Sequence, residues 1–280
     1  MTPANPWLPE AAAESSTGRV RSRNEDSFGY LAERGIFIVC DGMGGAAGGE
    51  IASQMTVKMV LERMATEAAA EAGCETLRAA IADANRAVHE RGERDAGLYG
   101  MGTTLVALVL RPGPGGANSG CAAQSESEAD SSTSRRSGSA HSRRAATGTA
   151  LIAHAGDSRC YLFRGEELRR CTHDHSLVDE QMRLGTMTRE EADRSPFRSV
   201  ITRAVGTQQS VSEEVKEMPV EPGDVFLLCS DGLTREVSEV DIAAVLSSES
   251  GLTGAAKRLV EAANDAGGRD NVTCLLVRVP

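Results

Sequence analysis

Carboxylate side chains recur at the ends of the apolar runs that predict strands. Asp41 directly follows the run 36–40, and Asp231 follows the run 225–229 after one serine. One Asp-Gly pair by itself indicates a turn more often than a ligand. The recurrence suggests a single site for a hard cation such as Mg²⁺ or Mn²⁺, because glycines adjoin four of the positions and soft ligands are missing nearby. The carboxylates are Glu25, Asp26, Asp41, Asp157, Asp231 and Asp270.

The order of the predicted strands and helices indicates antiparallel sheets. Residues 28–30 and 36–40 form one predicted hairpin, and residues 160–163 and 167–170 form another. Strands far outnumber the crossover helices that a parallel sheet requires, which excludes a doubly wound α/β fold. We expect an α+β fold, with helices packed outside two central antiparallel β-sheets. Further strands are predicted at residues 103–110, 150–155, 200–204, 211–218, 225–229 and 272–279, and helices at residues 50–70, 76–91, 177–184, 188–193, 242–246 and 254–264.

Two segments lie outside this pattern. Residues 1–14 are rich in proline and alanine and lack the basic and apolar regions of a signal peptide, so we expect a flexible leader. Residues 112–147 are rich in Ser, Gly, Ala and Arg and contain almost no large apolar side chain. Such a segment cannot bury enough surface to offset the entropy of ordering it. We expect one domain over residues 15–280, with a disordered insertion at 112–147.

Charge and composition exclude several classes of protein. A net charge of −10 and an aromatic content of 3% argue against nucleic-acid binding. The longest apolar stretch, residues 105–110, is far too short to span a membrane. The seven cysteines include no C-x-x-C pair and predict neither a zinc site nor a disulfide framework. We expect a cytoplasmic monomer.

Short motifs along the chain resemble those of the bacterial PP2C-like (PPM) family of metal-dependent serine/threonine protein phosphatases. The run 18–27, which contains Arg21, Glu25 and Asp26, is similar to the first motif of that family. The matches occur in order from residue 18 to 279, and only residues 112–147 are left over. The other motifs are Asp41-Gly42-Met43-Gly44-Gly45, Gly156-Asp157-Ser158-Arg159, His173-Asp174-His175-Ser176, residues 201–206, Ser230-Asp231-Gly232-Leu233-Thr234 and Arg269-Asp270-Asn271-Val272-Thr273.

The resemblance implies a four-layer α-β-β-α sandwich and two Mn²⁺ or Mg²⁺ ions. It implies that Asp41 bridges both ions and that the Gly42 carbonyl assists one of them, while Asp231 and Asp270 complete the other. Glu25 and Asp26 would act through water in the outer shell. A water between two divalent cations ionises near neutral pH and attacks phosphorus directly. The substrates implied are phosphoserine and phosphothreonine on proteins, in opposition to a bacterial Ser/Thr kinase.

The resemblance also assigns roles to residues that surround the ions. Arg21 would clamp the phosphoryl oxygens, where a planar guanidinium makes two charge-assisted hydrogen bonds. Asp157 corresponds to the ligand of a third, weaker metal. Relatives often place a carboxylate four residues after the Asp231 position, but this chain has Arg235, and a cation there weakens a metal site. Met43 excludes protonation of the leaving group by a side chain at that position.

Three alternatives remain open at this point. The pattern C-x-x-G-x-x-R from Cys229 to Arg235 is that of cysteine-dependent phosphatases, although Asp231 within it would repel a phosphate. A metal-poor pseudophosphatase would bind phosphoproteins without cleaving them. His173 and His175 have a spacing that could bind metal, and a loop-stabilising role is the competing interpretation.

Overall fold

Two antiparallel sheets form the centre of the protein. The computed structural model describes residues 7–44, 48–66, 73–113 and 148–280. One sheet has five strands in the order β1 (Glu10–Ser16), β11 (Val272–Arg278), β10 (Val225–Cys229), β7 (Arg159–Arg164) and β8 (Glu167–Arg170). The six-stranded sheet has the order β2 (Asp26–Leu31), β3 (Ile36–Met43), β5 (Leu105–Pro112), β6 (Gly148–Ala155) and β9 (Glu214–Val220), with β4 (Gly102–Thr103) paired to β3.

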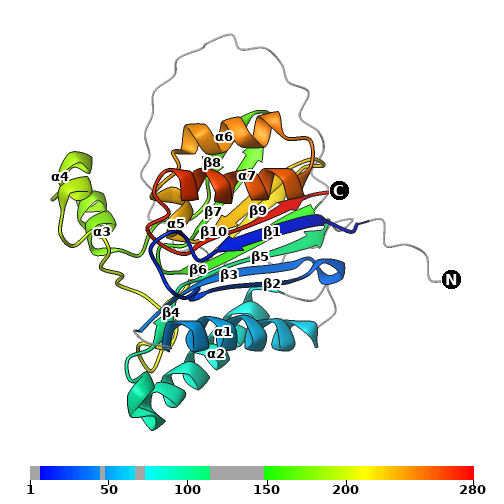
Figure 1. Cartoon of the computed structure of the whole chain (residues 1–280). Helices are drawn as coiled ribbons and strands as arrows, with labels where there is room; N and C mark the ends of the chain where they lie inside the picture. Colours follow the sequence, from blue (N-terminus) through cyan, green and yellow to red (C-terminus); the bar gives the residue numbers. More distant parts are fainter. Residues whose placement is uncertain (1–6, 45–47, 67–72, 114–147) are drawn as a thin grey trace.

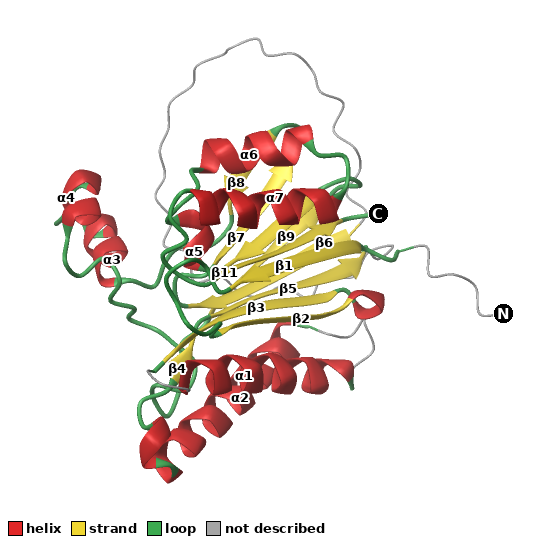
Figure 2. Ribbon diagram, in the orientation of Figure 1, coloured by secondary structure: helices red, strands yellow, loops and turns green. Residues whose placement is uncertain are grey.

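Helices cover the outer face of each sheet (Figure 1). The six-stranded sheet packs against α1 (Gly48–Ala65) and α2 (Cys74–Arg94), and the five-stranded sheet packs against α6 (Glu239–Ser248) and α7 (Leu252–Asp265). Figure 2 shows the resulting order of layers, helix, sheet, sheet and helix. The predicted four-layer sandwich is confirmed. Three shorter helices are α3 (Leu177–Arg183) and α4 (Arg189–Arg194), which lie to one side of the sandwich, and α5 (Asp231–Thr234).

The central strands are buried on both faces, and this explains their continuous apolar sequences. In β3, Phe37 and Val39 point into the core between the sheets, where they join Phe226 and Leu228 of β10. The alternate residue Ile38 points outward into the core beneath α1 and α2. Each sheet face therefore buries apolar area, which is the main favourable contribution to folding.

Two expectations about the backbone are wrong. Residues 10–14 of the expected leader belong to β1, which pairs with β11 along its whole length. Residues 200–204 form no strand and contribute one isolated bridge, between Ile201 and Ser176. Pairing with a distant segment makes residues 10–14 a strand, whereas the apolar residues at 200–204 have no such partner among the described residues beyond the single bridge.

The insertion at 112–147 falls mostly outside the described residues, since β5 ends at Pro112 and β6 begins at Gly148. These two strands pair antiparallel from Leu105–Ala155 to Pro112–Gly148, which confirms that the flanks of the insertion are neighbours in one sheet. Among the residues that the structure describes, no helix is both long and apolar enough to cross a bilayer.

Candidate metal centre

The predicted carboxylates converge at one end of the sandwich, where the two sheets come together. A cavity of about 640 Å³ opens there. Asp26 lies directly behind its wall, opposite Asp41 in the pairing of β2 with β3. The sequence-predicted residues in the lining of the cavity are Arg21, Glu25, Asp41, Gly42, Asp157, Asp231 and Asp270.

The backbone around Asp41 is held by two threonines just before β5. The N–H of Asp41 donates to Thr104 Oγ1 at 2.9 Å, and Thr103 Oγ1 donates to the Asp41 carbonyl at 2.8 Å. The next residue is Gly42 because a Cβ atom there would lie 2.1 Å from the carbonyl oxygen of Gly49. The close approach of α1 to β3 therefore requires glycine at this position.

The five-stranded sheet supplies the opposite side of the cavity. Asp231 begins α5 directly after β10, and Asp270 lies just before β11. These two segments touch at Gly232, where a Cβ would lie 1.9 Å from the Asn271 carbonyl oxygen. Asp270 accepts a hydrogen bond from the Asn271 N–H at 2.9 Å. The two aspartates are thus held beside each other by backbone contacts.

The electrostatics of the cavity call for bound cations. Burial, together with the neighbouring carboxylates of Asp26 and Asp231, raises the pKa of Asp41 well above its usual range. Burial raises the pKa of Asp26 to about 6, although hydrogen bonds from Thr273 and Ser230 oppose the shift. One carboxylate oxygen of Asp26 and one of Asp231 are buried without a hydrogen-bond partner in the described structure. Hard divalent cations fit this donor set, because clustered carboxylates favour being charged when a cation is beside them.

Arg21 lies at the mouth of the same cavity. Its side chain is 52% exposed, and its Nη2 donates to Asp270 Oδ2 at 2.9 Å. A guanidinium in this position can reach an anion in the cavity while staying in contact with solvent. Met43, also in the lining, carries no group that could protonate a leaving oxygen.

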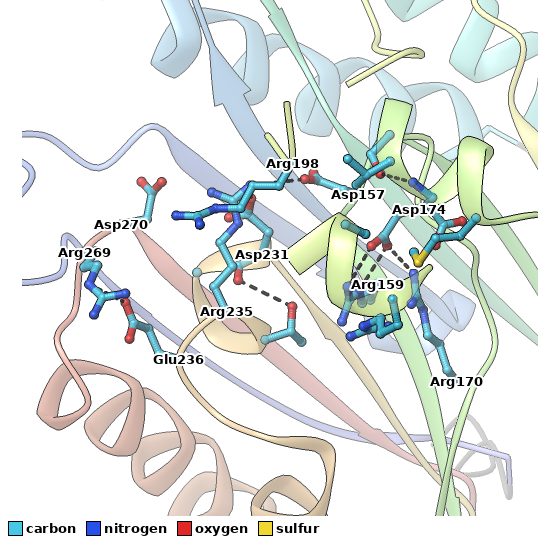
Figure 3. A pocket seen from close by; sticks show the side chains of 18 residues that line it. Asp157, Arg159, Arg170, Asp174, Arg198, Asp231, Arg235, Glu236, Arg269 and Asp270 are labelled. Atoms are coloured by element: carbon cyan, nitrogen blue, oxygen red, sulfur yellow. Dashed lines mark hydrogen bonds and ion pairs between the residues drawn. The ribbon is translucent and has the colours of Figure 1, made fainter. Parts of the chain in front are cut away.

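A second cavity, of about 480 Å³, extends from the carboxylates toward α3 and α4 (Figure 3). It shares Asp157, Asp231 and Asp270 with the first cavity, and its lining also includes Met182 and Arg198. The short helices predicted at 177–184 and 188–193 therefore stand beside the site. Asp174 in this wall accepts hydrogen bonds from Arg159 and from Arg170.

The histidines form a separate buried cluster. The rings of His154 and His175 stack with centroids 4.5 Å apart, and Glu214 lies within reach of both. His175 Nδ1 accepts a hydrogen bond from the Gly156 N–H at 3.2 Å, so its Nε2 carries the proton and donates to Glu214 at 3.3 Å. His154 Nε2 donates to the His173 carbonyl at 2.7 Å. These contacts tie the segment 173–175 to the loop before Asp157 and stabilise that loop.

Cys229 cannot serve as a nucleophile in this structure. It is the last residue of β10, is completely buried, and burial raises the pKa of its thiol to about 12. A thiolate is required for attack on phosphorus, so the cysteine-dependent mechanism is excluded.

Sequence reasoning gave no separate role to several residues that support the site. Asn271 binds two backbone groups of the first motif and one of Thr17 just before it, and Ser230 Oγ donates to Asp26 Oδ2 at 2.7 Å. Their positions beside Asp270 and Asp231 were the available signal. Arg235 was expected only to weaken a metal site, whereas it contacts both Asp157 and Asp231.

Comparison with known proteins agrees with this geometry. Residues 15–276 match the family described as Protein phosphatase 2C. The chain is 34% identical over 273 residues to the serine/threonine phosphatase stp of Listeria monocytogenes, and the match covers 95% of this chain and 94% of that protein.

Solved structures give the same result. The crystal structure of the Mycobacterium tuberculosis serine/threonine phosphatase PstP superposes with a TM-score of 0.77 at 32% identity and covers 96% of this chain and 98% of that one. The PstP catalytic domain in complex with two manganese ions has a TM-score of 0.74 at 31% identity and covers 98% of this chain and 99% of that one. The matches extend over nearly the whole chain and include every strand that shapes the cavity. The chain belongs to the protein phosphatase 2C family of serine/threonine phosphatases.

Proposed function

We propose that this protein removes phosphate from phosphoserine and phosphothreonine on proteins with two Mn²⁺ or Mg²⁺ ions. The observation that carries the proposal is the meeting of Asp41, Asp231 and Asp270 in one cavity with Arg21 at its mouth. Two bound divalent cations supply Lewis acidity and lower the pKa of water toward neutrality. The PstP structure with two manganese ions supports this number of ions.

Each residue of the cavity has a distinct role in the proposal. Asp41 would hold the ions from the six-stranded sheet, with the Gly42 carbonyl assisting one of them, and Asp231 and Asp270 would complete the other from the five-stranded sheet. Glu25 and Asp26 form the outer shell of the site and act through water. Arg21 orients the phosphoryl group and neutralises charge that develops on its oxygens.

The reaction proceeds without a covalent intermediate. Water attacks phosphorus and gives up a proton, the bond to the serine or threonine oxygen breaks, and this departing oxygen takes up a proton from water to form the alcohol. Met43 has no titrating group that could protonate the leaving oxygen. Cys229 is completely buried and cannot form a covalent intermediate. We further propose that the protein acts on phosphoproteins as a cytoplasmic monomer and opposes a Ser/Thr kinase. The relatives named serine/threonine phosphatases support the action on phosphoproteins.

The test is Mn²⁺-dependent hydrolysis of a phosphothreonine peptide by the full chain and by Asp231→Asn and Asp270→Asn. We expect each variant to lose at least about 100-fold in kcat, as when a group that stabilises the transition state is removed. Asp265→Asn is the matched control, because Asp265 lies on α7, is 77% exposed and is not among the residues that line the cavity. Full activity in excess EDTA would refute the proposal, and tight peptide binding without turnover would indicate a pseudophosphatase.

A further inference from the structure

Arg235 lies among the carboxylates of the metal centre. It is the first residue after α5 and lies one helical turn after Asp231. Its Nη2 contacts the Asp231 carboxylate closely and lies 3.5 Å from Asp157 Oδ2. All three residues line the cavity shown in Figure 3. One guanidinium therefore bridges two acidic side chains that follow different strands, β6 and β10.

Asp157 is not a surface carboxylate that could turn away from this contact. Its side chain is 8% exposed. The preceding Gly156 has a φ of +110° and packs against Thr104, and the hydroxyls of Ser158 and Thr104 are 2.7 Å apart. The backbone N–H of His175 donates to the Gly156 carbonyl at 3.0 Å. The loop thus holds Asp157 toward Asp231 from both sides.

Two buried carboxylates this close need a positive charge between them. Burial raises the pKa of Asp157, and the charge of Arg235 opposes that shift. In most settings a divalent cation meets this need, but a guanidinium stays charged at every physiological pH. A divalent cation at the same two carboxylates would be repelled by Arg235 and would have to displace it.

We propose that the guanidinium of Arg235 occupies the third cation position, between Asp157 and Asp231, so that this chain binds two divalent ions and excludes a third. The inference rests on the proposed two-ion function. Asp157 then pairs with an arginine and does not serve as a metal ligand. Asp231 keeps a second oxygen, Oδ1, that is buried without a hydrogen-bond partner in the described residues and is free to face the two ions.

One observation favours the opposite outcome and defines the test. Asp157 Oδ1 is also buried without a hydrogen-bond partner in the described part of the chain, so it could accept an ion. If it does, removal of the Asp157 charge must lower the number of bound ions. If Arg235 holds the position, the same change must leave that number unaltered.

The experiment measures the number of Mn²⁺ ions bound per full-length chain, by equilibrium dialysis and metal analysis. Four variants accompany the wild type: Asp157→Asn, Arg235→Asp, Arg235→Lys and the double variant with Asp157→Asn and Arg235→Asp. We expect two ions for the wild type, Asp157→Asn and Arg235→Lys, three for Arg235→Asp, and two again for the double variant. Circular dichroism establishes that each variant is folded.

Several results would overturn the inference. A third ion in the wild type that Asp157→Asn removes would show that Arg235 does not exclude it. Two ions in folded Arg235→Asp would show that something else limits the number. If Arg235→Asp does not fold, the comparison of wild type with Asp157→Asn decides. A wild type that binds no Mn²⁺ would instead refute the proposed function, so the two failures are distinguishable.

Discussion

The side-chain oxygen of Asn271 accepts a hydrogen bond from the Glu25 N–H at 2.8 Å, which joins the last motif of the chain to the first. The amide nitrogen of Asn271 donates to the carbonyls of Thr17 and Arg23 at 3.0 and 2.8 Å. Asn271 is 5% exposed, so these bonds are shielded from water. One amide thus sets the position of the segment that carries Arg21.

Asn271→Ala would leave three backbone groups without their partner. We expect the free energy of unfolding to fall by about 3 kcal/mol, because each unsatisfied buried group costs about 1–3 kcal/mol and some will recruit water. Urea denaturation checks the loss. Mn²⁺ affinity, measured under native conditions, should also fall, since Glu25 is no longer held. Unchanged stability would mean that the segment holds its place without Asn271.

Gly42→Ala should disrupt the site through the backbone. The new Cβ would lie 2.1 Å from the Gly49 carbonyl and 2.5 Å from that of Glu25, so α1 must shift. We expect a loss of about 1–3 kcal/mol in stability, as for other overpacked sites, together with weaker Mn²⁺ binding. Gly251→Ala is the control, because nothing lies within 4 Å of its added Cβ. Equal effects of the two changes on Mn²⁺ affinity would contradict the prediction.

Arg21→Ala should impair substrate binding more than metal binding. The guanidinium lines the cavity but is not one of the proposed metal ligands. KM should therefore rise by about 10-fold or more, as expected when a charge-assisted hydrogen bond to the substrate is lost. Arg21→Lys should recover part of the loss, because lysine keeps the charge without the two-pronged geometry. Calorimetry with Mn²⁺ checks the metal affinity. Lost metal binding with an unaltered KM would show that the assigned role is wrong.

The buried histidine pair should make stability depend on pH. Burial, with a smaller effect from His175, lowers the pKa of His154 from 6.5 to about 4. The unfolded chain therefore binds the proton first, and the stabilisation present above pH 6.5 is lost as the pH falls toward 4. At pH 5 the loss is about 2 kcal/mol relative to pH 8. Urea denaturation of His154→Gln should show a pH dependence smaller by that amount, and an identical dependence would exclude His154 as its source.

Cys229→Ala should leave kcat/KM unchanged, because the thiol is buried in β10 and has no route to the phosphoryl group. The free energy of unfolding should fall by about 1 kcal/mol, as expected for the loss of a small buried group. Phosphopeptide hydrolysis and urea denaturation measure the two effects. A collapse of activity in a folded variant would revive the cysteine mechanism.

The sequence predicted the carboxylates and most of the strands because both signals are local. Asp41, Asp231 and Asp270 each adjoin a run of apolar residues whose length and turns identify a strand. The structure of β1 was not predictable in this way, since Ala11 and Ala13 are small and weak strand formers, and only pairing with β11 makes the segment regular. The direction in which the Arg235 side chain points was equally unpredictable from the sequence. Nothing near Arg235 in the sequence indicates that it reaches Asp157, which lies on a distant loop.

If Asp41, Asp231 and Asp270 hold the ions as proposed, the division of these ligands between the two sheets has a mechanical consequence. Asp41 belongs to the six-stranded sheet, while Asp231 and Asp270 adjoin strands of the five-stranded sheet. The thickness of the apolar layer between the sheets, which includes Phe37 and Leu228, therefore sets the separation of the ligands. Any change that lets one sheet slide on the other will alter ion affinity without touching the cavity. Conversely, bound ions fasten the sheets together, so part of the binding free energy resists their separation.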